Sequence, residues 1–207
     1  MKLYFSIFLL GISLIACNDE KNNDKVKPTV LVKKDVPLGK NDTITRSAPI
    51  INITDTTENS FYVLCFKDSA KNTIRLSEKL GIIYGQKIDS FLKKSKITPI
   101  GPPMAWYKSQ KAPFFFEAGI PVAKKIAKLP KGAYLKKMGG TRVVVAHFYG
   151  PYEETVQAYQ ALKEWIADAR KKTNGSSYEI YVDDPVDEKG NVKDPYKVQT
   201  DIVFPYR

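Results

Sequence analysis

The residues best suited to chemistry lie in a short run near the C-terminus, Tyr178-Glu179-Ile180-Tyr181, where an acid alternates with aromatic side chains. We expect a strand over residues 178–183, so Glu179 and Tyr181 share one face of a sheet. A carboxyl group buried among aromatic rings has a raised pKa unless it is paired, because burial disfavours its charged form. It can pair with a cation, accept a hydrogen bond, or act as a general acid or base. An ordinary ion pair with one of the many lysines is the alternative.

The face on which Glu179 lies decides whether it can meet a ligand. Helices must cover one face of such a sheet, and Ile180 suits that core. We therefore expect Glu179 and Tyr181 on the face that the helices leave open. An internal repeat makes Ala105 and Tyr107 their counterparts. The small side chain of Ala105 opposite Glu179 would leave space for a ligand.

Aromatic side chains from other strands are candidates for the walls of the same pocket. They would offer apolar contact and, for a cation, an attraction of about 0.5–2 kcal/mol. The repeat places Tyr107 and Tyr181 symmetrically, which makes them the best candidates, and Tyr149 is a further one. Trp106 should face the helices by the same alternation. His147, the only histidine, either borders the pocket or is a core or edge residue with satisfied ring nitrogens.

Other kinds of chemistry lack their sequence patterns. One histidine and the lone Cys65 cannot furnish a zinc site of familiar spacing, so no metal is expected. The acids from Asp183 to Asp194 lack the ordered spacing of a calcium loop. No Ser-His-Asp order, nucleophile elbow or glycine-rich phosphate loop is present, and no cofactor is predicted. The residues favour binding without turnover and leave catalysis undecided.

The elements that must position these residues form two similar halves, each read as strand, helix, strand and strand. The first half is predicted at residues 61–66, 74–94, 103–108 and 114–122, and the second at 142–149, 152–172, 178–183 and 197–205. Landmarks agree between the halves, because Gly101 precedes Tyr107 by six residues and Gly175 precedes Tyr181 by six. Self-similarity at this scale predicts a duplicated β-α-β-β unit.

Several short motifs follow one another in a characteristic order. They are Gly101-Pro102-Pro103, Phe116–Val122, Leu129–Gly132, Val143–Phe148, Gly150–Glu154, Tyr159–Leu162 with Trp165, Tyr178–Pro185 and Gln199–Pro205. Together they resemble the GyrI-like small-molecule-binding domain, which also serves as the effector-binding domain of AraC-type and other bacterial regulators. The similarity extends over residues 60 to 207.

The resemblance implies an α+β fold of two β-α-β-β units related by a pseudo-twofold axis. Helices would lie on one side of an antiparallel sheet, and a cleft between the halves would take flat or hydrophobic small molecules. Glu179 would face that cleft. The sequence departs from the family's regulators because it contains no DNA-binding domain. It is also strongly basic, unlike an acidic mimic that docks on a DNA-binding enzyme such as gyrase.

The first residues predict export. Met1 and Lys2 give a short positive start, residues 3–15 are almost wholly apolar, and Ala16 directly precedes Cys17. The apolar stretch is shorter than the roughly 18–20 residues that span a bilayer, so residues 1–16 are predicted to be a signal peptide. The ending Leu-Ile-Ala-Cys resembles the lipobox of bacterial lipoproteins. It implies cleavage before Cys17, lipidation of that residue, for example with palmitate, and a membrane anchor. An ordinary secretory signal with an incidental cysteine is the alternative.

Residues 17–60 are predicted to be the lipidated Cys17 and a flexible tether, since their polar composition cannot bury enough apolar surface to offset chain entropy. One of the short apolar stretches, such as Thr29-Val30-Leu31-Val32 or Pro49-Ile50-Ile51, could still pair with a sheet edge. Residues 61–207 form the domain and hold 25 Lys and Arg against 15 Asp and Glu. An exported protein rarely meets nucleic acid, so this charge predicts weak contact with anionic envelope surfaces or a solvated surface without a partner.

Three functions are consistent with these predictions. The first is a lipid-anchored protein of the bacterial cell envelope, expected at the outer membrane, that captures a hydrophobic or amphipathic small molecule in an aromatic cleft around Glu179. The second is a hydrolase of reactive small molecules, in which Glu179 activates water beside Tyr181 or Tyr107. This hypothesis rests on the resemblance of some members of the family to enzymes of that kind. The third is an envelope interaction protein that uses its basic surface.

Overall fold

The computed structural model describes residues 48–207. The predictions for the signal peptide, for Cys17 and for residues 17–47 of the tether concern residues outside this range. The described residues form one eight-stranded sheet. Its strands are β1 (Ile50–Glu58), β2 (Phe61–Ala70), β3 (Met104–Tyr107), β4 (Phe114–Val122), β5 (Ala133–Met138), β6 (Thr141–Tyr149), β7 (Tyr178–Tyr181) and β8 (Gln199–Tyr206). Their order is β1-β6-β8-β7-β3-β4-β2-β5, and every neighbouring pair is antiparallel.

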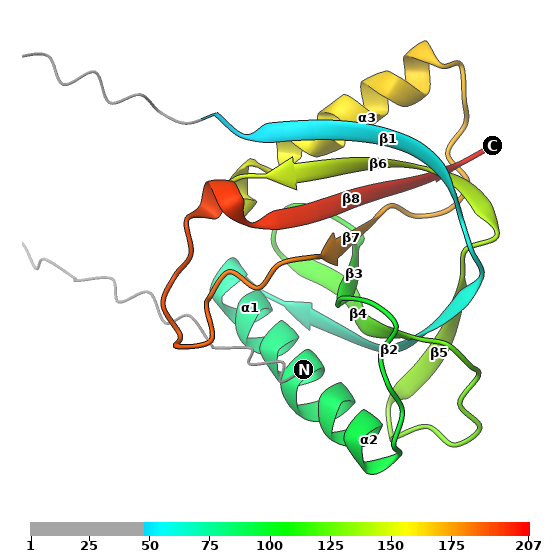
Figure 1. The fold of residues 1–207 in the computed structure, drawn as a ribbon, viewed down its shortest axis with the longest axis vertical. Coiled ribbons are helices and arrows are strands. Elements are labelled where there is room, and N and C mark those ends of the chain that lie inside the picture. Colours follow the sequence, from blue (N-terminus) through cyan, green and yellow to red (C-terminus); the bar gives the residue numbers. More distant parts are fainter. Residues whose placement is uncertain (1–47) are drawn as a thin grey trace, which may run out of the picture. The chain divides into compact units, whose positions relative to one another are not determined.

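Two helical stretches pack on the same face of this sheet (Figure 1). The first runs without a break through α1 (Thr73–Gly81), a π-helical segment (Ile82–Ile88) and α2 (Asp89–Lys94), which confirms the helix predicted over residues 74–94. The second is α3 (Val156–Asp168), preceded by a 3-10 turn at Tyr152–Glu154. It ends four residues earlier than predicted, and Arg170 just beyond it has a φ of 51°.

The chain repeats the β-α-β-β order, which confirms the predicted α+β class. The first unit contains β2, α1–α2, β3 and β4, and the second contains β6, α3, β7 and β8. The units meet at the centre of the sheet, where β3 pairs with β7 and Ala105 lies directly opposite Glu179. Helix α3 packs against strands of the second unit, and the helical stretch from α1 to α2 packs against strands of the first (Figure 1).

Each unit also receives an edge strand from the other half of the chain. β1 leads into the first unit but pairs with β6 of the second, and β5 leads into the second unit but pairs with β2 of the first. Residues 50–58 are therefore a strand and not part of a tether, and β5 was not predicted. The reason is burial: most of β1 is exposed and β5 is mostly half-buried, so neither shows the alternation of a strand with one covered face.

The turn between β1 and β2 and the turn between β5 and β6 lie next to each other. The backbone amide of Gly140, in the turn between β5 and β6, donates a hydrogen bond of 2.7 Å to the carbonyl of Glu58 at the end of β1. Its neighbour Gly139 has a φ of 75°, and a side chain there would overlap the backbone of Asn59. Glycine is required here by both the conformation and the close approach of the two turns.

Both faces of the sheet are buried along its middle. On the face that carries the helices, here called the helix face, separate clusters pack beneath α1–α2 and beneath α3. On the opposite face, here called the rear face, the bent strands enclose a third cluster, which includes Val63, Cys65, Met104, Trp106 and Tyr178. No helix within residues 48–207 is both long and apolar enough to cross a membrane.

Candidate functional site

Glu179 lies on β7, fully buried, and points to the helix face. Its carboxylate accepts a hydrogen bond of 2.9 Å from the Tyr159 hydroxyl of α3, which shows that the prediction of an open face is wrong. The prediction failed because the rear face has an apolar core of its own. Ile180 and Trp106 pack in that core, so their hydrophobicity does not identify the face that the helices cover.

Four tyrosines surround the carboxylate. Besides Tyr159, the hydroxyls of Tyr152 and Tyr181 donate to Glu179 Oε2 at 2.8 and 3.0 Å. The hydroxyls of Tyr107 and Tyr181 form a hydrogen bond of 2.6 Å with each other. The structure thus brings together three residues selected from the sequence, Glu179, Tyr181 and Tyr107, on the two central strands.

This cluster contains an acid without a cationic partner. No lysine or arginine of the described chain forms an ion pair with Glu179, so the ordinary ion pair considered from the sequence is not seen. Burial raises the pKa of Glu179, and the hydrogen bonds from Tyr152, Tyr159 and Tyr181 offset only part of that effect. Burial, together with the nearby carboxylate, also raises the pKa of Tyr181, so that tyrosine remains a hydrogen-bond donor.

A cavity of about 270 Å³ opens on the helix face beside this cluster. It is lined by Thr73 and Leu76 of the first helix, by Tyr107, Gln110 and Phe114, and by Tyr152, Glu153, Thr155 and Val156 before and within α3. Tyr107 and Tyr152 belong to both the cavity wall and the tyrosine cluster. Tyr152 is 38% exposed while its hydroxyl bonds Glu179. One layer of tyrosine therefore separates the buried carboxylate from the cavity.

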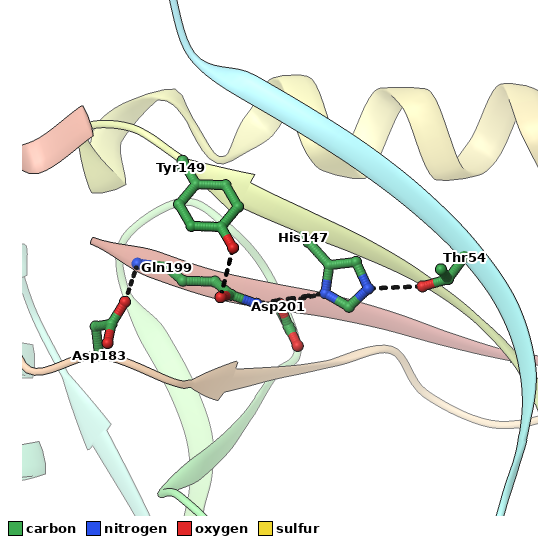
Figure 2. Close-up of polar contacts among 6 residues, drawn as sticks. All are labelled: Thr54, His147, Tyr149, Asp183, Gln199 and Asp201. Carbon is green, nitrogen blue, oxygen red and sulfur yellow. Dashed lines mark hydrogen bonds and ion pairs between the residues drawn. The ribbon is translucent and has the colours of Figure 1, made fainter. Parts of the chain in front are cut away.

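His147 and Tyr149 lie away from this site, although the sequence made both of them candidates. Figure 2 shows them in a polar cluster formed by β1, β6 and β8. His147 bonds Thr54 Oγ1 through Nε2 at 2.6 Å and Asp201 Oδ1 through Nδ1 at 2.8 Å. The Tyr149 hydroxyl donates to Gln199 at 2.7 Å. The alternation along β6 places His147 on the rear face with Val143 and Val145, as a half-buried residue of an inner strand with both ring nitrogens bonded.

Two important residues were not selected from the sequence as ligands of Glu179, namely Tyr152 and Tyr159. The sequence predicts for Tyr159 only a place in the buried stripe of the helix, because Val156, Tyr159, Leu162 and Ile166 recur at helical spacing. A signal was nevertheless present, because a buried tyrosine hydroxyl needs a hydrogen-bond partner and a purely apolar stripe provides none. Tyr152 gives no such signal, since its position depends on how the loop before α3 folds over the sheet.

The family model for the GyrI-like small molecule binding domain matches residues 84–207. This chain belongs to that family. The match includes the whole of the second β-α-β-β unit and strands β3 and β4 of the first. It also includes Glu179 and its four tyrosines.

Solved structures share this GyrI-like fold. The C-terminal domain of EcmrR is 18% identical over 78% of this chain and 99% of its own, with a TM-score of 0.60. EcmrR in its complex with DNA is 16% identical over 77% of this chain, with a TM-score of 0.59, and this chain spans 57% of its length. A hydrolase from Listeria innocua is 11% identical over 75% of this chain and 91% of its own, with a TM-score of 0.56. At these identities the likeness concerns the fold, and no match was found among curated proteins.

Proposed function

We propose that this protein captures an amphipathic small molecule on its helix face, with a cationic group directed to Glu179 and an apolar part in the adjoining cavity. The observation that carries the proposal is a fully buried carboxylate with three tyrosine donors and no cationic partner among the residues that the structure describes. Membership of a small-molecule-binding family supports the binding role. The chemical class of the ligand is our inference from the site.

The charge of the ligand follows from the electrostatics. A buried carboxylate is costly when it lacks a positive partner, and hydrogen bonds from Tyr152, Tyr159 and Tyr181 offset only part of this cost. A cation entering from the cavity would provide that partner. The tyrosine rings would add cation–π attraction of about 0.5–2 kcal/mol.

Access to the carboxylate depends on one side chain. Tyr152 both lines the cavity and donates to Glu179, and it belongs to the short 3-10 turn before α3. Rotation of this half-exposed ring would connect the cavity with the carboxylate without disturbing the sheet. We therefore propose Tyr152 as the residue that moves when the ligand binds.

A matched pair of probes tests the proposal. N-methylacridinium carries a permanent positive charge, whereas acridine has nearly the same shape and is mostly neutral at pH 8. We expect purified protein to bind the cation more tightly, as measured by fluorescence titration. The Glu179→Gln variant should lose at least about tenfold in affinity for the cation, because a buried charge partner is removed. Its affinity for acridine should change little.

Glu153→Gln provides the matched control, since Glu153 lines the same cavity but is exposed to solvent. It removes the same charge, and screening by water should limit its effect to about twofold. Equal affinities of the two probes, or equal effects of the two variants, would contradict a role for Glu179 in binding a cation.

The same carboxyl group supports a second candidate, hydrolysis of a reactive small molecule such as an epoxide. A raised pKa suits proton transfer, and tyrosine hydroxyls lie within hydrogen-bonding distance of Glu179. Glu179 would take a proton from water as the water oxygen bonds a ring carbon, and Tyr152 would protonate the oxygen released from the ring. Diol formation from styrene oxide that is lost in Glu179→Gln would favour this candidate. Saturable binding without product favours the first.

We also propose that the protein is anchored through Cys17 in a bacterial cell envelope. The support is the sequence pattern of a short positive start, an apolar stretch and Ala16 before Cys17. Labelled palmitate should enter the wild-type protein in a bacterial host, and the protein should sediment with membranes. The Cys17→Ser variant should show neither property, while the Cys65→Ser variant, which removes a buried thiol, should retain both.

A further inference from the structure

A second cavity, of about 320 Å³, opens on the rear face of the first unit. Its wall includes the lysines Lys67, Lys108 and Lys136, the aromatic residues Trp106 and Phe115, and the acid Glu117. The strand register explains how they meet. Glu117 on β4 lies between Lys67 on β2 and Trp106 on β3, and the cavity lies above this row. It is on the opposite face of the sheet from Glu179.

The charges in this cavity do not balance. Glu117 forms ion pairs with both Lys67, at 3.5 Å, and Lys136. The neighbouring Asp68 is paired at 2.6 Å with Lys79 and does not neutralise the rear face. Lys108 has no ion pair within the described chain. Three ammonium groups therefore face a single available carboxylate.

The same wall presents an aromatic surface to solvent. The Phe115 side chain is on the rear face beside Lys108, and the residue is 51% exposed. Trp106 is buried, and the Lys136 ammonium lies 4.0 Å from the centre of its ring. An exposed ring next to uncompensated positive charge suits a flat molecule that carries a negative group.

The corresponding place in the second unit has no such character. His147 and Asp201 occupy the positions equivalent to Lys67 and Glu117, because each pair lies directly opposite in its own strand ladder. There the acid bonds His147 and Gln199 (Figure 2), and no lysine of residues 48–207 forms an ion pair with it. The accumulation of lysines is thus specific to the first unit and does not result from the repeat.

We propose that the rear-face cavity binds an aromatic anion, such as a carboxylate or sulfonate attached to a flat ring. The negative group lies between Lys108 and Lys67, and the ring packs against Phe115. This site is separate from the helix-face site and prefers the opposite charge.

Calorimetric titration of the purified protein with 2-naphthalenesulfonate tests the proposal, with neutral 2-naphthol as the matched probe. The sulfonate should bind saturably, more tightly than the naphthol, and less tightly as salt is added. Lys108→Gln should weaken sulfonate binding by about two- to fivefold, the usual range for a solvent-exposed charge pair. Phe115→Ala should weaken it by about three- to tenfold. Neither variant removes a hydrogen bond or ion pair, so both should fold.

Two control variants locate the site. Lys163→Gln removes the same charge from the exposed side of α3 and should leave sulfonate affinity unchanged. Glu179→Gln should also leave it unchanged, because its side chain lies on the other face. The proposal is overturned if the sulfonate shows no saturable binding at millimolar concentration, or if Lys163→Gln weakens binding as much as Lys108→Gln. Tighter sulfonate binding in Glu179→Gln would also overturn it, since loss of a carboxylate favours the anion only if the anion occupies the helix-face site.

Discussion

The two β-α-β-β units have the same strand order but differ where they meet. At the centre of the sheet, β3 presents Ala105 and β7 presents Glu179 at directly opposed positions. The next position on this face is tyrosine in both units, and the hydroxyls of Tyr107 and Tyr181 bond each other across the pseudo-twofold axis. The duplicated frame thus provides a symmetric pair of tyrosines, and a single acid on one side makes the site asymmetric.

The helices differ in a related way. In the first unit, the Tyr84 hydroxyl donates to the backbone carbonyl of Met104 at 2.8 Å. In the second, the Tyr159 hydroxyl donates to the Glu179 side chain. Each helix thus directs a tyrosine to the central strands, where one hydroxyl bonds a backbone carbonyl and the other bonds a carboxylate. The helix tyrosine of the first unit thus serves packing, whereas that of the second unit binds the charged group.

The largest effect should come from removing this asymmetry with Ala105→Glu. Ala105 is fully buried, so the variant would place a second carboxylate directly opposite Glu179. We expect a loss of unfolding free energy of about 3–5 kcal/mol at pH 8, because two unpaired acids share one buried site. Urea unfolding followed by circular dichroism measures this loss.

The matched control for this variant is Ala105→Gln, which adds a similar volume without charge. It should cost about 1–3 kcal/mol from overpacking alone. The difference between the two variants should shrink as the pH falls, since burial and like charge raise the pKa of both carboxyl groups and protonation relieves the repulsion. Equal stabilities of the two variants at pH 8 would contradict the view that a single acid is what the site tolerates.

The exchange of edge strands between the units is tested by Gly139→Ala. This residue has a φ of 75° and lies against Asn59, in the turn between β1 and β2. We expect a loss of about 3 kcal/mol in unfolding free energy, from backbone strain plus the displacement of that turn. Gly190→Ala is the control, because Gly190 has a φ of 84° but no atom within 4 Å of an added side chain. It should cost only about 1 kcal/mol, and equal losses would show that the contact between the turns contributes nothing.

A smaller effect should appear in the pH dependence of stability. The pKa of Glu179 is raised in the folded protein by burial, relative to its ordinary value of 4.5. The folded state therefore holds a proton that the unfolded state loses, and this contribution to stability declines as pH rises above 4.5. The decline amounts to about 1.4 kcal/mol for each pH unit by which the pKa is raised. Stability curves of Glu179→Gln should lack this decline, whereas those of Glu153→Gln should keep it.

Much of the frame could be predicted from sequence. The helical spacing of Leu162 and Ile166 indicates the second helix, although the helix ends at Asp168 and not at the predicted residue 172. The strands of both units were recognisable because most of them contain short runs of apolar residues. Edge strands β1 and β5 could not be recognised in this way. Their side chains are mostly exposed or half-buried, so the sequences of these segments resemble that of a linker.

The sequence by itself determined the repeat, because local periodicity and spacing record it. It also determined the α+β class and the choice of Glu179, Tyr107 and Tyr181, through this repeat together with the resemblance to the GyrI-like family. Only the tertiary structure decided which face these residues occupy. Alternation divides a strand into two faces without saying which one meets the helices, and here both faces bury apolar residues. The position of His147 and the closure of Tyr152 over the carboxylate likewise depend on contacts between residues far apart in the chain.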